Sequence, residues 1–243
     1  MDPHGTIWLI DLLRGTTSRF TFNAAIHQFP VFSPDGQQVL FVSNRSGSND
    51  LYIKAANGVG DETLLLKKAD GVSDWSADAK AVLYAVLSPF FQVWALPMTS
   101  DKKPFPLVNQ KFQSIRAKFS PDGRWFAYAS SESGRNEIYV QTFPPTGGKS
   151  QLSVNGGEYV YWRRDGMEII FGTADRKIMA VDVKLGTSFE PGVPRQLFEI
   201  PQTMAGVRFA ISSDAQRFLI PLFSETNRPT LTTVLNWTAD IKK

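Results

Sequence analysis

The feature that most constrains this chain is a short turn-like segment that occurs five times at nearly constant spacing. Each copy is centred on an aspartate, and consecutive aspartates are separated by 43, 44, 43 and 49 residues. The copies are Phe32-Ser33-Pro34-Asp35-Gly36, Trp75-Ser76-Ala77-Asp78-Ala79, Phe119-Ser120-Pro121-Asp122-Gly123, Trp162-Arg163-Arg164-Asp165-Gly166 and Ile211-Ser212-Ser213-Asp214-Ala215. A fixed period of this length indicates a repeat architecture in which each repeat is one supersecondary unit.

Two apolar positions accompany every aspartate. The residues three positions before it are Phe32, Trp75, Phe119, Trp162 and Ile211, and those six positions after it are Phe41, Tyr84, Tyr128, Phe171 and Ile220. We expect both sets to be buried between neighbouring repeats. We expect the aspartates to cap the backbone of their turns rather than to bind metal, because aspartate stabilises turns in this way.

Each period reads as four short strands. In the first full repeat these are residues 29–32, 39–42, 51–53 and 63–66, which are rich in β-forming residues and are separated by turn residues. No window shows a convincing helical stripe. Four antiparallel strands in each period of about 43 residues are typical of a β-propeller blade. The sequence therefore predicts an all-β fold, a β-propeller of four-stranded antiparallel blades.

The predicted repeats fill the whole chain as a single propeller domain. Their approximate bounds are 1–24 (partial), 25–67, 68–110, 111–154, 155–200 and 201–243. Five full repeats plus an N-terminal half repeat allow either five blades with one strand to spare, which we slightly favour, or six blades with one incomplete. We expect an N-terminal strand to complete the last blade. The first methionine falls inside a repeat, which suggests a fragment of a longer protein.

Composition argues against several classes of function. The chain has 26 Lys and Arg against 23 Asp and Glu, without a basic run, so we expect no nucleic-acid partner. It contains no cysteine, which excludes disulfides and thiolate metal sites. No stretch approaches the roughly 18 apolar residues of a membrane span, so we expect no membrane insertion. Residues 1–15 lack the order of basic and then apolar residues that is typical of a secretion signal.

Propeller ligands bind where the first strands of the blades begin. Counting back from the turn aspartates places seven polar side chains at that level: His27, Asp70, Ser114, Arg116, Glu158, Tyr159 and Arg208. We predict that Arg116, Tyr159, Arg208 and Ser114 bind a ligand, which is a protein or a small polar molecule. His27 would add a proton-dependent charge near pH ~6.5.

The same residues suggest metal binding, ion pairing or catalysis. Asp70, Asp74 and Glu158, with His27, offer ligands for a divalent metal such as calcium. The alternative, which we favour, is a channel of mixed charge in which the arginines pair with the carboxylates. Catalytic candidates are His27, Asp70 and Glu158. A triad of His27, Ser114 and Asp70 lacks a Gly-x-Ser-x-Gly elbow and is disfavoured.

The repeat motifs resemble a known family. The Ser-Pro-Asp-Gly segments, together with Asn44 to Gly47 and Glu132 to Asn136, resemble TolB-type WD-like propeller repeats. A narrower similarity, carried by residues 119–125, 162–166 and 234–238, is to the C-terminal propeller region of acidobacterial serine/threonine protein kinases. The kinase motifs themselves are absent. The resemblance implies a propeller that senses or binds, in a periplasmic or otherwise extracytoplasmic location.

Two functions therefore stay open. The first is a non-catalytic binding module of a sensor or scaffold protein. The second is a promiscuous, metal-assisted hydrolase of esters, lactones or phosphotriesters, with its site at the central channel, as in metal-dependent propeller hydrolases. An outer contact surface around Phe90 and Phe91 is a further place for function, although these side chains could equally tuck beneath their blade.

Overall fold

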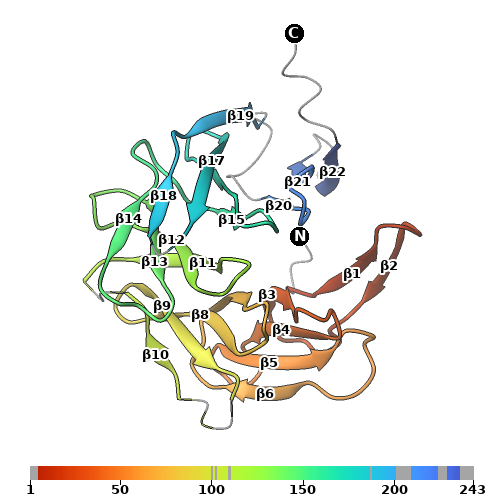
Figure 1. The fold of residues 1–243 in the computed structure, drawn as a ribbon. Helices are drawn as coiled ribbons and strands as arrows, with labels where there is room; N and C mark the ends of the chain where they lie inside the picture. The colour runs from red at the N-terminus through yellow and green to blue at the C-terminus, as the bar shows by residue number, and fades with distance from the viewer. Residues whose placement is uncertain are drawn as a thin grey trace. The chain divides into compact units, whose positions relative to one another are not determined.

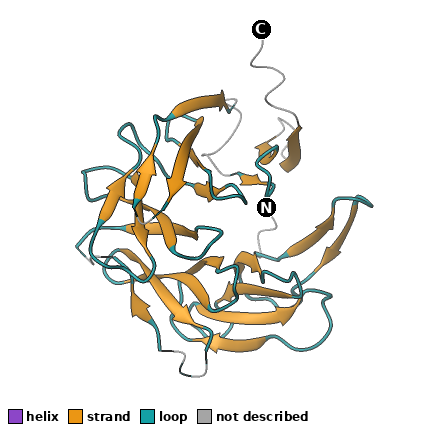
Figure 2. Cartoon of the chain, in the orientation of Figure 1, coloured by secondary structure: helices purple, strands orange, loops and turns teal. Residues whose placement is uncertain are grey.

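Every regular element in the described part of the chain is a β-strand (Figure 2). The computed structural model describes residues 5–99, 101, 103–108, 111–186, 188–200, 209–223 and 229–235, with only the backbone of 221–223 and 229–235. No helix among these residues is long and apolar enough to cross a membrane. Residues 1–108 form one compact unit and residues 109–243 another.

The first unit contains a two-stranded sheet and two four-stranded sheets. The two-stranded sheet is β1 (Trp8–Asp11) and β2 (Thr16–Arg19). The next is β3 (His27–Phe32), β4 (Gln38–Ser43), β5 (Asp50–Ala55) and β6 (Thr63–Leu66). The third is β7 (Gly71–Trp75), β8 (Ala81–Leu87), β9 (Phe91–Pro97) and β10 (Phe105–Pro106). Within each sheet, consecutive strands pair antiparallel (Figure 1).

The second unit repeats this arrangement. Its first sheet is β11 (Ser114–Phe119), β12 (Trp125–Ser130), β13 (Glu137–Thr142) and β14 (Lys149–Gln151). Its second is β15 (Val160–Trp162), β16 (Glu168–Gly172), β17 (Lys177–Leu185), β18 (Phe189–Pro191) and β19 (Arg195–Glu199). Its third is β20 (Ala210–Ile211), β21 (Arg217–Phe223) and β22 (Pro229–Leu235). A half repeat followed by five repeats is therefore confirmed, whereas closure of the ring stays a prediction.

Sheets stack face to face within each unit, and this explains their unbroken apolar strands. Strand β3 packs on β7, and β11 packs on β15. All six residues of β12 are buried, as are all five of β16. A strand covered on both faces needs no polar side, so its sequence is a continuous apolar run rather than an alternation.

The two predicted apolar columns differ in how well they are covered. All five residues six positions after the aspartates are buried: Phe41, Tyr84, Tyr128, Phe171 and Ile220. In the other column Trp75, Phe119 and Trp162 are buried, but Phe32 is 54% exposed, so its predicted burial is wrong. In the sheets where it is buried, the aromatic side chain at this position packs on the preceding sheet. Among the residues that the structure describes in the first unit, the sheet that precedes Phe32 consists of β1 and β2, and these two strands leave Phe32 uncovered.

One blade departs from the four-strand pattern. After β17 the chain forms an extra strand, β18, which pairs with Val183 to Leu185 before β19 completes the sheet. Phe189 on β18 lies with its ring centroid 5.7 Å from that of Trp125 and 6.4 Å from that of Trp162. The insertion thus closes the apolar space between two neighbouring sheets with an aromatic side chain. The sequence pattern had not predicted it.

The turn aspartates cap their turns as predicted. Asp35, Asp78 and Asp122 each accept a hydrogen bond from the serine hydroxyl two residues earlier, at 2.5, 2.7 and 2.6 Å, and from the backbone N–H two residues later. Asp214 is bonded in the same way by Ser212 and the N–H of residue 216. Asp165 instead accepts one hydrogen bond from the Arg163 guanidinium and one from the backbone N–H of residue 167.

Replacing Trp162 should test the inter-sheet core. Trp162 is 8% exposed, belongs to the apolar cluster between two sheets, and donates from Nε1 to the Lys118 carbonyl oxygen at 3.1 Å. Trp162→Ala should lower the free energy of unfolding by about 3–5 kcal/mol, because a buried aromatic ring is lost and leaves a cavity. Urea titration measures this, with Trp8→Ala, at a half-exposed tryptophan, as control. A loss at Trp162 below about 1 kcal/mol would show that the core is misassigned.

The capped carboxylates should also make the fold sensitive to acid. Serine hydroxyls, the largest cause, lower the pKa of Asp35, Asp78 and Asp214 below the ordinary 3.8, and backbone N–H groups add to this. A carboxyl group with a lowered folded pKa stabilises the fold above its unfolded pKa, and this contribution is lost as the pH falls below about 3.8. Unfolding free energy measured from about pH 5 to about pH 2 should therefore fall steeply.

The matched variant for this acid effect is Ser76→Ala, which removes the hydroxyl donor 2.7 Å from Asp78. Its unfolding free energy should fall less steeply with acid than that of the parent chain, because the pKa of Asp78 moves back toward 3.8. Parallel curves for the two proteins would contradict the assignment.

Candidate functional site

An irregularity in an inner strand positions Arg116. The pairing of β11 with β12 shifts between Ile115 and Lys118, so Arg116 lies on a β-bulge. Its φ is +57°, in the left-handed region that costs a non-glycine residue on the order of 1–3 kcal/mol. Bulges re-aim side chains and are frequent beside functional sites. The fold therefore maintains local strain at a residue that the sequence assigned to ligand binding.

The guanidinium group of Arg116 is held by its two neighbours in the next repeat. Its Nη1 donates to Oε2 of Glu158 at 3.0 Å. Its central carbon lies 4.0 Å from the centroid of the Tyr159 ring, close enough for a cation–π contact. The side chains of Arg116 and Glu158 are 34% and 32% exposed, so the pair faces solvent. The structure thus brings together three of the predicted site residues.

Backbone contacts fix the segment that carries Glu158 and Tyr159. The N–H of Glu158 donates to the carbonyl oxygen of Gly172 at 2.9 Å, and the N–H of Gly172 donates to the carbonyl oxygen of Tyr159, also at 2.9 Å. Gly157 must be glycine here, because a Cβ atom would lie 2.5 Å from Cγ1 of Ile138. The neighbouring blade is therefore close enough to define where these side chains begin.

A pocket of about 630 Å³ opens beside Glu158 in the second unit. Its lining residues are Arg135, Asn136, Asn155, Gly156, Gly157, Glu158, Ala174, Asp175 and Lys177. Two further ion pairs stand at its wall, Arg135 with Glu137 at 2.8 Å and Lys177 with Asp175 at 2.7 Å. The charges that line this pocket are therefore of both signs, whereas the predicted mixed-charge channel stays a prediction. The sequence analysis missed Asp175, in the turn between β16 and β17, and Lys177, at the start of β17, because it counted only to the beginnings of the first strands.

Two predicted residues are buried rather than open to solvent. Ser114, at the start of β11, is 1% exposed. His27 is 3% exposed, packs edge-on against Phe41, and has its Nε2 2.7 Å from the Asn23 side-chain oxygen. Burial, followed by the charge of Arg45, lowers the pKa of His27 below 6.5. The expectation of a proton-dependent charge near pH ~6.5 is therefore wrong, because the core disfavours the imidazolium ion.

Asp70 has structural partners on both oxygen atoms. Oδ1 accepts from the Asn49 side-chain amide at 3.2 Å, and Oδ2 accepts from the N–H of Leu87 at 2.8 Å. Asp74 lies on β7 in the same unit, whereas Glu158 belongs to the other unit. Among the described residues, no three His, Asp or Glu side chains are grouped closely enough to hold a metal ion. The calcium site therefore stays a prediction, and Arg208 lies outside the described residues.

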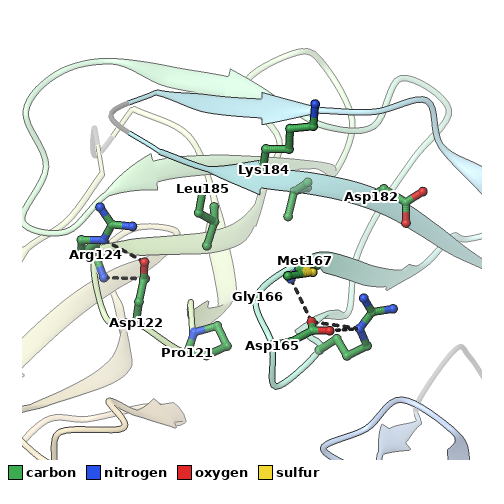
Figure 3. A pocket seen from close by; sticks show the side chains of 11 residues that line it. Pro121, Asp122, Arg124, Asp165, Gly166, Met167, Asp182, Lys184 and Leu185 are labelled. Carbon is green, nitrogen blue, oxygen red and sulfur yellow. Dashed lines mark hydrogen bonds and ion pairs between the residues drawn. The ribbon is translucent and has the colours of Figure 1, made fainter.

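A larger pocket, of about 850 Å³, lies elsewhere in the second unit, between two turns and strand β17 (Figure 3). Its basic side chains are largely satisfied by their own turns. Nε of Arg124 donates to Asp122 at 2.8 Å, and Nε of Arg163 donates to Asp165 at 2.9 Å. This pocket, like the one beside Glu158, is therefore lined by charges of both signs, most of which are paired within the protein.

Comparison with known proteins supports the fold. No protein-family model matches the chain. TolB from Acinetobacter baumannii is similar over 97% of this chain, with a TM-score of 0.74 and 18% identity, and the chain covers 58% of that TolB, less than two thirds. A structure of the nidogen/laminin complex is similar over 97% of this chain and 88% of its own, with a TM-score of 0.71 and 10% identity.

An oligogalacturonate lyase in complex with manganese is also similar, over 97% of this chain and 73% of the lyase, with a TM-score of 0.63 and 11% identity. At such low identities the likeness shows the fold alone. The predicted fold class is confirmed: the chain is an all-β, TolB-like β-propeller built from antiparallel blades. The narrower similarity to kinase-linked propellers stays a prediction.

Proposed function

We propose that this chain is a non-catalytic binding module of a sensor or scaffold protein, and that it binds an anionic group of its partner at Arg116. The observation that supports this most directly is the placement of the Arg116 guanidinium on a strained bulge, against the face of Tyr159. Among the described residues, the Arg116 guanidinium donates a hydrogen bond to Glu158. The remaining N–H groups suit a carboxylate or phosphate, which a guanidinium binds bidentately.

Glu158 then acts as the competitor that the ligand displaces. An ion pair whose members are each about one third exposed contributes at most about 1 kcal/mol, so exchange for an external carboxylate costs little. The mixed charges of the adjacent pocket would orient a polar ligand once its anionic group is bound. An extracytoplasmic sensor, which the family resemblance implies, fits this function.

A labelled oligoglutamate peptide tests the proposal by fluorescence anisotropy. Arg116→Ala should weaken binding about 10- to 100-fold, because a charge-assisted hydrogen bond is lost. Glu158→Gln should strengthen binding, because it removes the competing charge with little change in volume. Arg14→Ala, at an exposed arginine paired with Asp11, is the matched control and should have no effect. Equal affinities for the parent and Arg116→Ala would refute the site.

The second candidate is the metal-assisted hydrolase. Its specific support is that a protein of similar fold, the oligogalacturonate lyase, has been seen in complex with manganese. If a divalent ion binds through Asp70 and Glu158, then Asp70→Asn and Glu158→Gln should each reduce metal content, whereas Arg116→Ala should preserve it. Metal analysis, with an ester, lactone and phosphotriester panel before and after chelation, decides this. Turnover that survives complete removal of metal would exclude a metal-assisted mechanism.

A further inference from the structure

The turn between β8 and β9 in the first unit exposes two apolar side chains. Leu87 is 53% exposed and Phe90 is 50% exposed, and Ser88 and Pro89 between them are also exposed. Phe91, where β9 begins, is half-buried. Phe90 is therefore exposed instead of tucked beneath its blade.

The segment that contacts this hairpin tip contains two lysines. The segment that joins β6 to β7 contains Lys67 and Lys68, both exposed, and Asp70 at its end accepts a hydrogen bond from the N–H of Leu87. Neither lysine forms an ion pair with any residue that the structure describes. The nearby carboxylates already accept hydrogen bonds from other groups. Asp70 accepts one from the N–H of Leu87. The buried Asp50 accepts one from the N–H of Lys68 at 2.9 Å and others from serine hydroxyls.

Phe29 extends the apolar surface of this unit. It lies on the bulge of β3, is 50% exposed, and has its ring beside Gly71, where a Cβ atom would lie 3.7 Å from its Cδ2. Gly71 directly follows Asp70. We call Phe29, Leu87, Phe90, Lys67 and Lys68 the apolar–basic patch. Lys67 is close enough for its charge to lower the pKa of Asp50. Exposed apolar side chains together with exposed lysines outside close ion pairs are the chemistry of a surface that associates with anionic lipid.

The backbone of the hairpin tip is already suited to a medium of low polarity. The N–H of Leu87 is bonded to Asp70, and the N–H of Ser88 donates to the Phe90 carbonyl oxygen at 2.9 Å. Pro89 has no N–H. An unsatisfied N–H is costly in the absence of water, and the tip avoids this cost at three successive residues. This feature favours a lipid surface over a protein partner, which could supply hydrogen bonds of its own.

We propose that the apolar–basic patch docks the chain peripherally on an anionic lipid bilayer. Leu87 and Phe90 enter the boundary between headgroups and acyl chains, as apolar anchors of peripheral proteins do. Lys67 and Lys68 remain at the level of the headgroups and attract anionic lipid. The patch supplies few anchors, so binding is weak, reversible and sensitive to salt.

Co-sedimentation of the whole chain with vesicles tests this proposal. The protein should sediment with phosphatidylcholine vesicles that contain phosphatidylglycerol, much less with pure phosphatidylcholine, and less again at high salt. Lys67→Gln and Lys68→Asn should each weaken binding about fivefold. Asparagine is chosen because Lys68 has a φ of +58°, which asparagine tolerates. Phe90→Ser should weaken binding at both salt concentrations.

The controls separate this patch from other exposed apolar and basic residues. Leu13→Ser changes an apolar residue that is 99% exposed in the turn between β1 and β2, and Lys80→Gln changes a lysine paired with Asp78. Both variants should bind vesicles as the parent does, and thermal melts confirm that every variant folds. Failure of the parent to sediment with phosphatidylglycerol vesicles, or equal losses in patch and control variants, would overturn the proposal.

Discussion

Buried carboxylates accept hydrogen bonds from the segments that connect one blade to the next, and these bonds fix the positions of those segments. Asp50 and Glu137 are each 1% exposed and stand fifteen residues after a turn aspartate. Asp50 accepts from the N–H of Lys68, and both oxygens of Glu137 accept from the N–H of Gly156 at 3.0 Å. Each donor lies in the segment that leads to the next first strand. A buried charge is costly unless it is fully hydrogen-bonded, so these segments have little freedom to move.

This constraint reaches the candidate site directly. The segment bound by Glu137 continues into Gly157, Glu158 and Tyr159, and the N–H of Gly157 also donates to the Asn136 carbonyl oxygen at 2.9 Å. Ser153 adds a hydroxyl that donates to Glu137 at 2.5 Å. The position of Glu158 against Arg116 is therefore set by a carboxylate that touches neither side chain. A scaffold of this kind holds functional groups in place without any motion of the backbone.

Sequence analysis could predict what depends on local offsets. Turn caps such as Ser33 with Asp35, and strands such as β12, follow from residues close in the chain, where spacing alone determines contact. It failed where burial depends on side chains of another strand or sheet, and where a repeat contains an insertion. Phe32 is exposed because its neighbour is incomplete, His27 is buried by Phe41, and β18 arises in an insertion without repeat character. In the candidate site, counting back from the turn aspartates selected Arg116. No feature of the sequence indicated that Arg116 lies on a β-bulge.

The bulges show how one backbone device serves different chemistry. Phe29 and Arg116 both stand six residues before a turn aspartate, and their φ angles are +55° and +57°. Neither value is favoured by the side chain, and in both blades the pairing of the first strand with the second shifts at this position. The equivalent residue of the next blade, Val72, stands at a similar shift without a positive φ, so this strain belongs to the two blades that carry Phe29 and Arg116. An aromatic ring there adds to an apolar surface, whereas the guanidinium of Arg116 forms an ion pair with Glu158 and is the group that we propose binds an anion.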